Sequence, residues 1–382
     1  MTLTAGFGRA VITPPTPVQL AGFIEDQPAT EVHDDLEVRA LHLRGTHGSV
    51  CLLVCDLLGM SRRFATAVRT AVAGELGLPL GAVLTACVHT HAGPSTIEGS
   101  DRLGWVTPEG YLETLVDRSV DAARGALASA APARLRTGRW SLPDGLSVNR
   151  RGLPYEPAFA VVDVVGAADG ARIGTLANIA VHPVALGPEC LAVSSDWVGP
   201  FRDTLEQRAA GTAMLLSGAL GDVNPHHVHR QGNDCHGDGF AEAARLGRDL
   251  AEVVEGSLAS TVDVGDVEPS VDRHRVIDVP LGSTMLTGGR EGRTVPIELV
   301  EWRLGPLRLV SVPGEAFHAL GRAIEDRVAA AGEHVVVAGL SPEWHGYLPS
   351  PFRDGYEESM SYGREAVALV AGALTETTDP GA

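Results

Sequence analysis

Apolar and β-branched residues form short runs along this chain, and turn or helix signals separate the runs. Ser49–Cys55 (SVCLLVC) reads as a strand, and Arg62–Leu76 then has helical spacing. Gly77 followed by Pro79 supplies a stop signal for that helix. The next apolar run, Ala82–Val88, reads as a buried strand. Strand, helix and strand in this order predict a βαβ unit with parallel pairing of its strands.

A second βαβ unit is predicted near the end of the chain. Leu307–Val312 and Val335–Gly339 read as strands, and Ala316–Ala331 between them reads as a helix. Other runs predict strands at Gly6–Thr13, Glu37–Leu43, Arg134–Arg139, Ala158–Val165, Gly174–Val181 and Thr212–Leu216, and helices at Pro108–Ala131, Gly199–Ala210 and Phe240–Leu258. These elements predict an α/β fold, a mixed β-sheet core with flanking helices. No linker or charge run divides the chain, so we expect a single catalytic domain over residues 1–382.

Composition and charge exclude some classes of binding partner for this protein. Hydrophobic residues make up 44% of the 382 residues and charged residues 20%, an ordinary balance for a globular protein. The formal net charge of −18 argues against nucleic acid and anionic membranes as partners. No apolar run approaches the ~18 residues of a spanning helix, and the amino terminus has no signal-peptide pattern. Five cysteines, three of them within strand-like runs, suit buried reduced thiols. We expect a cytoplasmic protein with a small-molecule substrate.

Two histidines follow the strand at Ala82–Val88. In an extended chain, residues i and i+2 point to the same side, so His89 and His91 share one side of the strand's carboxyl end. Ligand sites of α/β proteins gather at such ends, and a pair of imidazoles there is a plausible start of a metal site. The alternative is a pair of polar residues that hydrogen-bond a loop.

Three further polar residues follow predicted strands. These are His182, Glu315 and Tyr347. A catalytic zinc site typically has two imidazoles and a carboxylate as ligands and one open coordination position. Zinc in such a site lowers the pKa of bound water to about 7. Taken singly, each residue has an ordinary alternative. His182 then is a loop residue, Glu315 a charge at a helix N-terminus, and Tyr347 a half-buried aromatic.

Several segments together resemble the neutral ceramidases, a family of zinc amidases, along most of the chain from Gly6 to Tyr362. The segments are GFGRAVITPP, VHDDLEVRAL, VCDLLGMS, VHTHAGP, the Asn149-Arg150 pair, VHPVAL with SSDWVG, GALGDVNP, PGE, GLSPEWHGYLPS and YEESMSYG. They occur in the family's order and at similar separations. The resemblance implies a single zinc ion held by His89, His182, Glu315 and Tyr347.

The resemblance also implies roles for residues around the metal. His91 matches a substrate-facing histidine, Arg150 a substrate-side arginine and Tyr356 a tyrosine that stabilises the oxyanion. Asp196 lies in the family's Ser-Asp element and is a candidate to orient a ligating histidine. The alternatives are a solvated loop charge for Arg150 and a helix cap for Asp196.

One departure from the family changes the expected chemistry. Ceramidases carry a serine, taken to be the nucleophile, where this chain has Asn224, and a carboxamide cannot form an acyl-enzyme. We therefore expect zinc-activated water to attack the carbonyl directly. Arg150, Tyr356 and Asn224 are then expected to stabilise the oxyanion, and His91 to act as general acid or base. The alternative for Asn224 is a turn residue before Pro225.

These observations predict a zinc-dependent hydrolase of an amide or related carbonyl bond in a small soluble substrate. We expect a short form of the family that lacks the signal peptide and the carboxy-terminal β domain of its secreted members, so membrane ceramide is not the expected substrate. The alternatives are a lactonase, a metal-assisted lyase or cyclase, and a non-catalytic zinc-binding homologue. The histidine-rich segment His226–His236 reads either as a solvated loop or as a second metal or substrate contact.

Overall fold

The computed structural model describes residues 3–24, 26–227, 238–329 and 332–376. Its largest element is a mixed β-sheet, which confirms the predicted α/β fold class. The strands follow the order β14 (Thr212–Ser217), β12 (Arg172–Ile179), β11 (Ala158–Gly166), β9 (Ala131–Ser141), β1 (Thr4–Val11), β5 (Glu37–Arg44), β6 (Ser49–Cys55) and β7 (Val83–Cys87), and β16 (Val262–Asp263) pairs with β9. The terminal pairs β6–β7 and β12–β14 are parallel, and the other pairs are antiparallel.

A second sheet contains β17 (Pro269–Pro280), β18 (Thr294–Leu304), β19 (Leu307–Ser311) and β21 (His334–Ala338) in that order. Only its β19–β21 pair is parallel. Both predicted βαβ units are confirmed, with α1 (Arg62–Leu76) between β6 and β7 and α6 (His318–Ala329) between β19 and β21. The helix α8 (Arg364–Thr375) was not predicted from the sequence.

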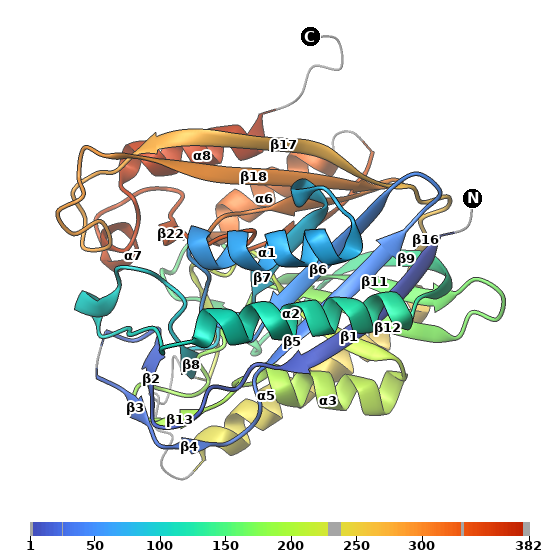
Figure 1. Ribbon diagram of the computed structural model, residues 1–382, viewed down its shortest axis with the longest axis horizontal. Helices are drawn as coiled ribbons and strands as arrows, with labels where there is room; N and C mark the ends of the chain where they lie inside the picture. Colours follow the sequence, from blue (N-terminus) through green and yellow to red (C-terminus); the bar gives the residue numbers. More distant parts are fainter. Residues whose placement is uncertain (1–2, 25, 228–237, 330–331, 377–382) are drawn as a thin grey trace.

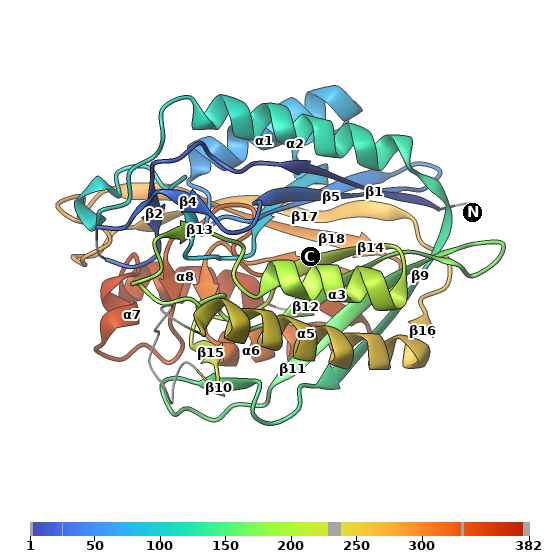
Figure 2. The ribbon, with the colours of Figure 1, turned by 90° about the horizontal axis from the view of Figure 1, so that it is seen from below.

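Helices cover the outer faces of both sheets. Figure 2 shows α1 and α2 (Tyr111–Ala128) on one side of the molecule, and α6 and α8 on the other. The pair α3 (Val198–Ala209) and α5 (Gly239–Ser257) packs together beside β14 (Figure 2). Within β6, Cys51, Leu53 and Cys55 belong to the core under α1 and α2, whereas Leu52 and Val54 belong to the core between the sheets. The strand is apolar throughout because both of its faces are buried.

Short elements connect these layers. They are β2 (Val18–Ala21), β3 (Pro28–Ala29), β4 (Glu31–Val32), β8 (Gly93–Pro94), β10 (Ser147–Asn149), β13 (Ala192–Val193), β15 (Val223–Pro225), β20 (Glu315–Ala316), β22 (Tyr347–Leu348), α7 (Tyr356–Ser359) and the 3-10 turns Leu80–Ala82, Asp101–Leu103 and Leu258–Ser260. No described helix has both the length and the apolar character needed to cross a membrane. Cys51, Cys55 and Cys87 are buried thiols, as predicted, and burial raises the pKa of Cys51 to about 12.

The two ends of the long sheet come close together. The hydroxyl of Ser217, at the end of β14, donates a hydrogen bond to the carbonyl of Val88, just past β7, at 2.9 Å. The second sheet joins at the same place, because the Gly339 N–H after β21 donates to the Ser217 carbonyl at 2.8 Å. The carboxyl ends of strands from both sheets therefore meet at one point, where the candidate residues lie.

Candidate metal centre

His89 and His182 are held by the same kind of contact. The Nδ1 atom of His89 lies 2.6 Å from the carbonyl oxygen of Leu58, and Nδ1 of His182 lies 3.0 Å from that of Val223. A carbonyl only accepts, so these contacts assign the ring proton to Nδ1 and leave the Nε2 lone pair of each ring available. His89 also adopts a φ of 79°, an uncommon left-handed backbone conformation for a residue with a side chain.

One carboxylate oxygen of Glu315 lies close to both imidazole rings. Its Oε2 lies 3.2 Å from Nε2 of His89 and 3.3 Å from Nε2 of His182. Its Oε1 accepts the indole N–H of Trp344 at 3.0 Å. Burial alone would raise the pKa of the Glu315 carboxyl, but the two histidines hold it well below its usual range. Burial, with the charge of Arg150, lowers the pKa of His182 to about 4. The carboxylate is therefore ionised and His182 is neutral, which are the states that bind a metal.

Tyr347 lies beside Glu315 because β22 and β20 pair in parallel with these two residues in register. Its hydroxyl accepts a hydrogen bond from Nη2 of Arg150 at 3.1 Å. Burial raises the pKa of the Tyr347 phenol well above its usual range, although the charge of Arg150 opposes this shift. A cation bound beside the phenol would lower that pKa. All four sequence-predicted ligands are thus brought to one place.

His91 lies next to this group in a different way. Its ring centroid is 5.0 Å from that of His89 and 4.8 Å from that of Phe23. Neither of its ring nitrogens has a hydrogen-bond partner among the described residues. Burial, with the neighbouring His89 and His182, holds its pKa well below the usual range. The ring also lies against Gly22, where a Cβ atom would stand 2.4 Å from the Cγ of His91.

Two donor sets compete for a metal ion at this place. The ligand atoms of His89, His91 and His182 lie within 4.8 Å of one another, which makes three imidazoles one candidate set. The other set is His89, His182 and Glu315. Metal-binding histidines almost always donate their second ring N–H to a carbonyl or carboxylate, and only His89 and His182 do so here. We therefore favour the set with Glu315, whose mixed nitrogen and carboxylate donors fit a divalent transition metal.

Arg150 is part of this site and not a solvated loop charge. Its Nη2 donates to the carbonyl of Gly221 at 2.8 Å, and its Nε lies 3.1 Å from a carboxylate oxygen of Glu357. Its guanidinium carbon lies 5.4 Å from the centroid of the Tyr347 ring. Burial would lower the pKa of Arg150, but Tyr347, Glu357 and Glu315 raise it above its usual value. No hydrogen bond joins its Nη1 to another described residue, so this nitrogen is available to a substrate.

Tyr356 and Asn224 lie at the edge of the site. Tyr356 is 46% exposed, and its ring stands edge-on to the Tyr347 ring with 6.1 Å between centroids. Asn224 lies in β15, whose backbone pairs with β10, and its Oδ1 is buried without a hydrogen-bond partner among the described residues. Neither residue makes a hydrogen bond to Glu315 or to the histidines.

Asp196, a candidate to orient a ligating histidine, makes no hydrogen bond to one among the described residues. Its carboxylate accepts the backbone N–H groups of Ala185, Leu186 and Trp197 at 2.6 to 3.2 Å, and so it holds the loop that follows His182. Backbone carbonyls hold the far nitrogens of the histidines instead. The histidine-rich segment His226–His236, for which the sequence left open a solvated loop or a second metal or substrate contact, falls largely on residues 228–237, outside the described residues.

Sequence reasoning did not find two side chains that support the site. Trp344 holds Glu315, and Glu357 holds Arg150. Both were within reach of a closer reading, because Trp344 stands three residues before Tyr347 and Glu357 directly follows Tyr356. The carbonyls of Leu58 and Val223 carry no signal in the sequence, since every residue has such a group.

Two solved ceramidase structures have a fold similar to that of this chain. The crystal structure of neutral ceramidase from Pseudomonas aeruginosa matches with a TM-score of 0.83 and 19% identity, covering 99% of this chain and 74% of that chain. A ceramidase complexed with C2 matches with a TM-score of 0.79 and 18% identity, covering 99% of this chain and 75% of that one. No family model and no curated protein matches the sequence. The resemblance read from the motifs is therefore confirmed for the fold.

Proposed function

We propose that this protein is a zinc-dependent hydrolase that cleaves an amide or related carbonyl bond in a small soluble substrate. The observation that carries the proposal is the convergence of Nε2 of His89 and Nε2 of His182 on one oxygen of Glu315. The fold shared with ceramidases supports it. A donor set of two imidazoles and one carboxylate, which leaves one coordination position open, suits zinc better than other metals.

A metal ion held by His89, His182, Glu315 and Tyr347 supplies Lewis acidity, which polarises a carbonyl and lowers the pKa of water. His91 then has the free ring nitrogen needed to accept a proton from the attacking water and to return it to the leaving nitrogen. Nη1 of Arg150 donates to the oxygen on which negative charge develops, while Nη2 fixes the guanidinium against Tyr347. Glu357 keeps that guanidinium in place.

Because of Asn224, we propose attack by water and not serine-based acyl transfer. By the motif resemblance Asn224 stands at the position of the family's serine, and a carboxamide offers no hydroxyl to carry an acyl group. Attack by water leaves no covalent intermediate on the chain. The buried Oδ1 of Asn224 has no partner among the described residues, so its amide group remains available to a substrate.

The test compares two histidine variants during turnover of a panel of N-acyl amides, esters and lactones. We expect His89→Ala to lose both the metal and the turnover. We expect His91→Ala to keep the metal but to lose turnover by about 10²–10⁴-fold, as for removal of a general base. Mass spectrometry of the quenched wild-type reaction should find no acylated protein.

The outcomes separate the rival functions. Turnover of lactones without turnover of amides would replace the amidase by a lactonase. An acylated chain would refute direct attack by water. Metal binding without turnover on any substrate in the panel would favour a non-catalytic zinc protein.

A further inference from the structure

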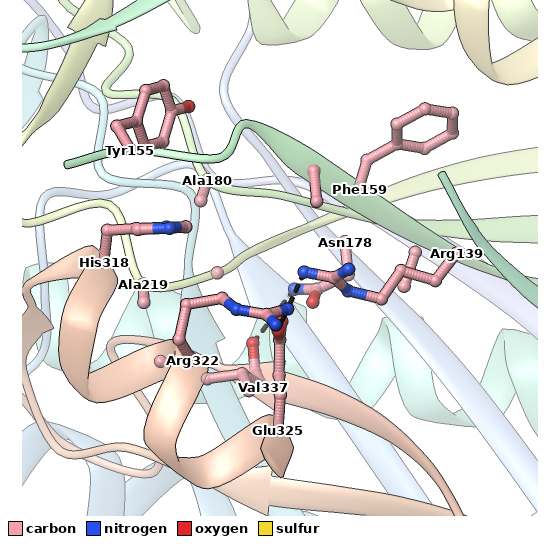
Figure 3. Close-up of a pocket in the computed structure, with 14 residues that line it drawn as sticks. Arg139, Tyr155, Phe159, Asn178, Ala180, Ala219, His318, Arg322, Glu325 and Val337 are labelled. Carbon is pink, nitrogen blue, oxygen red and sulfur yellow. Dashed lines mark hydrogen bonds and ion pairs between the residues drawn. The ribbon is translucent and has the colours of Figure 1, made fainter. Parts of the chain in front are cut away.

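Two of the cavities that are lined by arginines differ in charge, and neither has a candidate metal ligand among its lining residues. The first lies between β9, β11, β12 and α6 (Figure 3). Its Arg139 and Arg322 both donate to the same oxygen of Glu325, at 2.7 and 2.6 Å. The carboxylate between them offsets their charge, and the volume of about 30 Å³ leaves room only for about two water molecules. This cavity carries no ligand inference.

The second cavity has a volume of about 200 Å³. No candidate metal ligand is among the residues that line it. Most of its apolar wall comes from Ile97, Leu103, Leu286, Val295, Trp344 and Tyr362. An apolar cavity of about 150 Å³ is large enough to bind benzene, so this cavity has room for one aromatic ring and a small substituent.

Two arginines at this cavity have no acidic partner. Arg102 donates from Nη1 to the carbonyl of Gly99 at 2.8 Å and from Nη2 to the carbonyls of Met285, at 3.3 Å, and Leu286. Arg290 donates from Nε to the carbonyl of Thr287 at 3.0 Å and from Nη2 to that of Leu286 at 3.1 Å. Neither forms an ion pair with any described residue. The chain carries a formal net charge of −18, so two arginines without an acidic partner at one cavity contrast with the negative charge of the whole protein.

The acidic residues near the cavity are already paired. Glu98 lines the cavity, and its carboxylate lies 2.9 Å from Nη1 of Arg63. The third lining arginine, Arg62, lies 3.4 Å from the buried Glu343. Glu343 also lies 2.9 Å from Nε2 of His345. No described carboxylate forms an ion pair with Arg102 or Arg290, so the cavity keeps two guanidinium groups that bond only to backbone carbonyls.

The cavity also offers a fixed phenol. The hydroxyl of Tyr362 lies 3.1 Å from Nδ1 of His345, which holds the ring at the cavity wall. Burial raises the pKa of Tyr362 to about 12, so the phenol stays neutral. A neutral phenol and two guanidinium groups beside an apolar wall suit an anion attached to an apolar body.

We propose that this cavity binds a small molecule in which a carboxylate is joined to a ring-sized apolar group. Arg102 and Arg290 receive the carboxylate, because both are cations whose hydrogen bonds go only to uncharged backbone carbonyls. The apolar wall receives the ring. The proposal does not rest on the hydrolase function, since neither arginine touches the candidate metal centre.

Trp344 separates the two sites. It lines the cavity with its ring and donates its indole N–H to Oε1 of Glu315 at 3.0 Å. A ligand in the cavity therefore contacts the residue that holds a candidate metal ligand. This shared wall gives binding an optical readout, because the ligand changes the surroundings of an indole.

The experiment is a calorimetric titration of the full-length, zinc-loaded protein with benzoate, and separately with benzamide. Benzamide has the same ring without the charge. We expect benzoate to bind at least about tenfold more tightly than benzamide, because only benzoate makes charge-assisted bonds to the arginines. Tryptophan fluorescence should change over the same range of benzoate concentration.

Variants locate the binding site. We expect the double variant Arg102→Gln/Arg290→Gln to lose at least about tenfold in benzoate affinity. Arg293→Gln is the matched control, because Arg293 is an exposed arginine that does not line the cavity. Its benzoate affinity should equal that of the wild type. Circular dichroism checks the fold of each variant.

Three results would overturn the proposal. The first is equal affinity for benzoate and benzamide, a comparison that needs no variant. The second is benzoate binding that survives in the double variant and disappears in His89→Ala, because that pattern puts the ligand on the metal. The third is no detectable binding of benzoate up to about 10 mM, weaker than any specific site of this kind.

Discussion

Replacing Trp344 by Phe removes one hydrogen bond from the candidate metal centre and keeps an aromatic ring in place. The bond from the indole Nε1 to Oε1 of Glu315 is 3.0 Å long, and both side chains are buried, at 4% and 2% exposure. A hydrogen bond to a charged group contributes about 1.5–3 kcal/mol, which corresponds to about 10–100-fold in an equilibrium constant. Loss of a group that orients a metal ligand weakens metal binding by a similar factor. We expect Trp344→Phe to raise the zinc Kd by about 10–100-fold.

The assay is competition for zinc against a chromophoric chelator, and Trp302→Phe is its matched control. Trp302 is also buried, and its indole donates to the carbonyl of Gly81 at 2.8 Å. Both variants lose an indole hydrogen bond and some packing, but only Trp344 touches Glu315. We expect the zinc Kd of Trp302→Phe to stay within about twofold of wild type. Equal Kd values for the two variants would refute the role given to Trp344.

Three further predictions concern stability and the environment of His91. Glu298→Gln breaks a buried ion pair with Arg69 (2.7 Å) and should lower the free energy of unfolding by about 3 kcal/mol at pH 7 in urea titrations. Burial would raise the pKa of Glu298, but Arg69 and His274 lower it below 4.5. The ion pair therefore stabilises the folded protein above pH 4.5. The difference in unfolding free energy between wild type and variant should shrink as the pH falls through the lowered pKa of Glu298. Gly22→Ala should lower kcat/KM by displacing His91, whereas Gly145→Ala, with a similar positive φ but open space around it, should not. Zinc at about 100 times its Kd should stabilise the protein by about 2.7 kcal/mol over the metal-free form in thermal unfolding, and an unchanged Tm would contradict a bound metal.

The sequence predicted the strands of the long sheet other than β16, and the two βαβ units, because their hydrophobic patterns are strong and local. It assigned no ranges to β17 and β18 of the second sheet. Ser49–Cys55 matches β6 at both ends, and Arg62–Leu76 matches α1. Gly77 closes that helix in a left-handed conformation with a φ of 67°, as its stop signal implied. The helix α8 escaped prediction because Arg364–Thr375 follows a turn-rich segment in which no single pattern dominates.

The candidate site was predictable as a set of side chains but not as a geometry. Polar residues after strands pointed to His89, His91, His182, Glu315 and Tyr347, and the resemblance to ceramidases implied the ligand set without His91. The structure brings His89 and His182 to Glu315 and places Tyr347 in register beside it. What fixes their orientation is invisible in the sequence, because carbonyls such as that of Leu58 are common to all residues. The choice between the two roles considered for Asp196 could not be made from the sequence for a related reason, since backbone N–H groups compete with imidazoles for a buried carboxylate.

The most direct test of the metal centre is the metal content of the purified protein, measured beside two histidine variants. We predict about one zinc per chain in the wild type and none in His89→Ala. The matched control is His42→Ala, because His42 is equally buried but its Nε2 bonds to the Ser49 hydroxyl at 2.8 Å, away from Glu315. This variant should keep its zinc. A wild type that is empty and takes up no added zinc, or a His89→Ala variant that holds as much zinc as the wild type, would contradict the account.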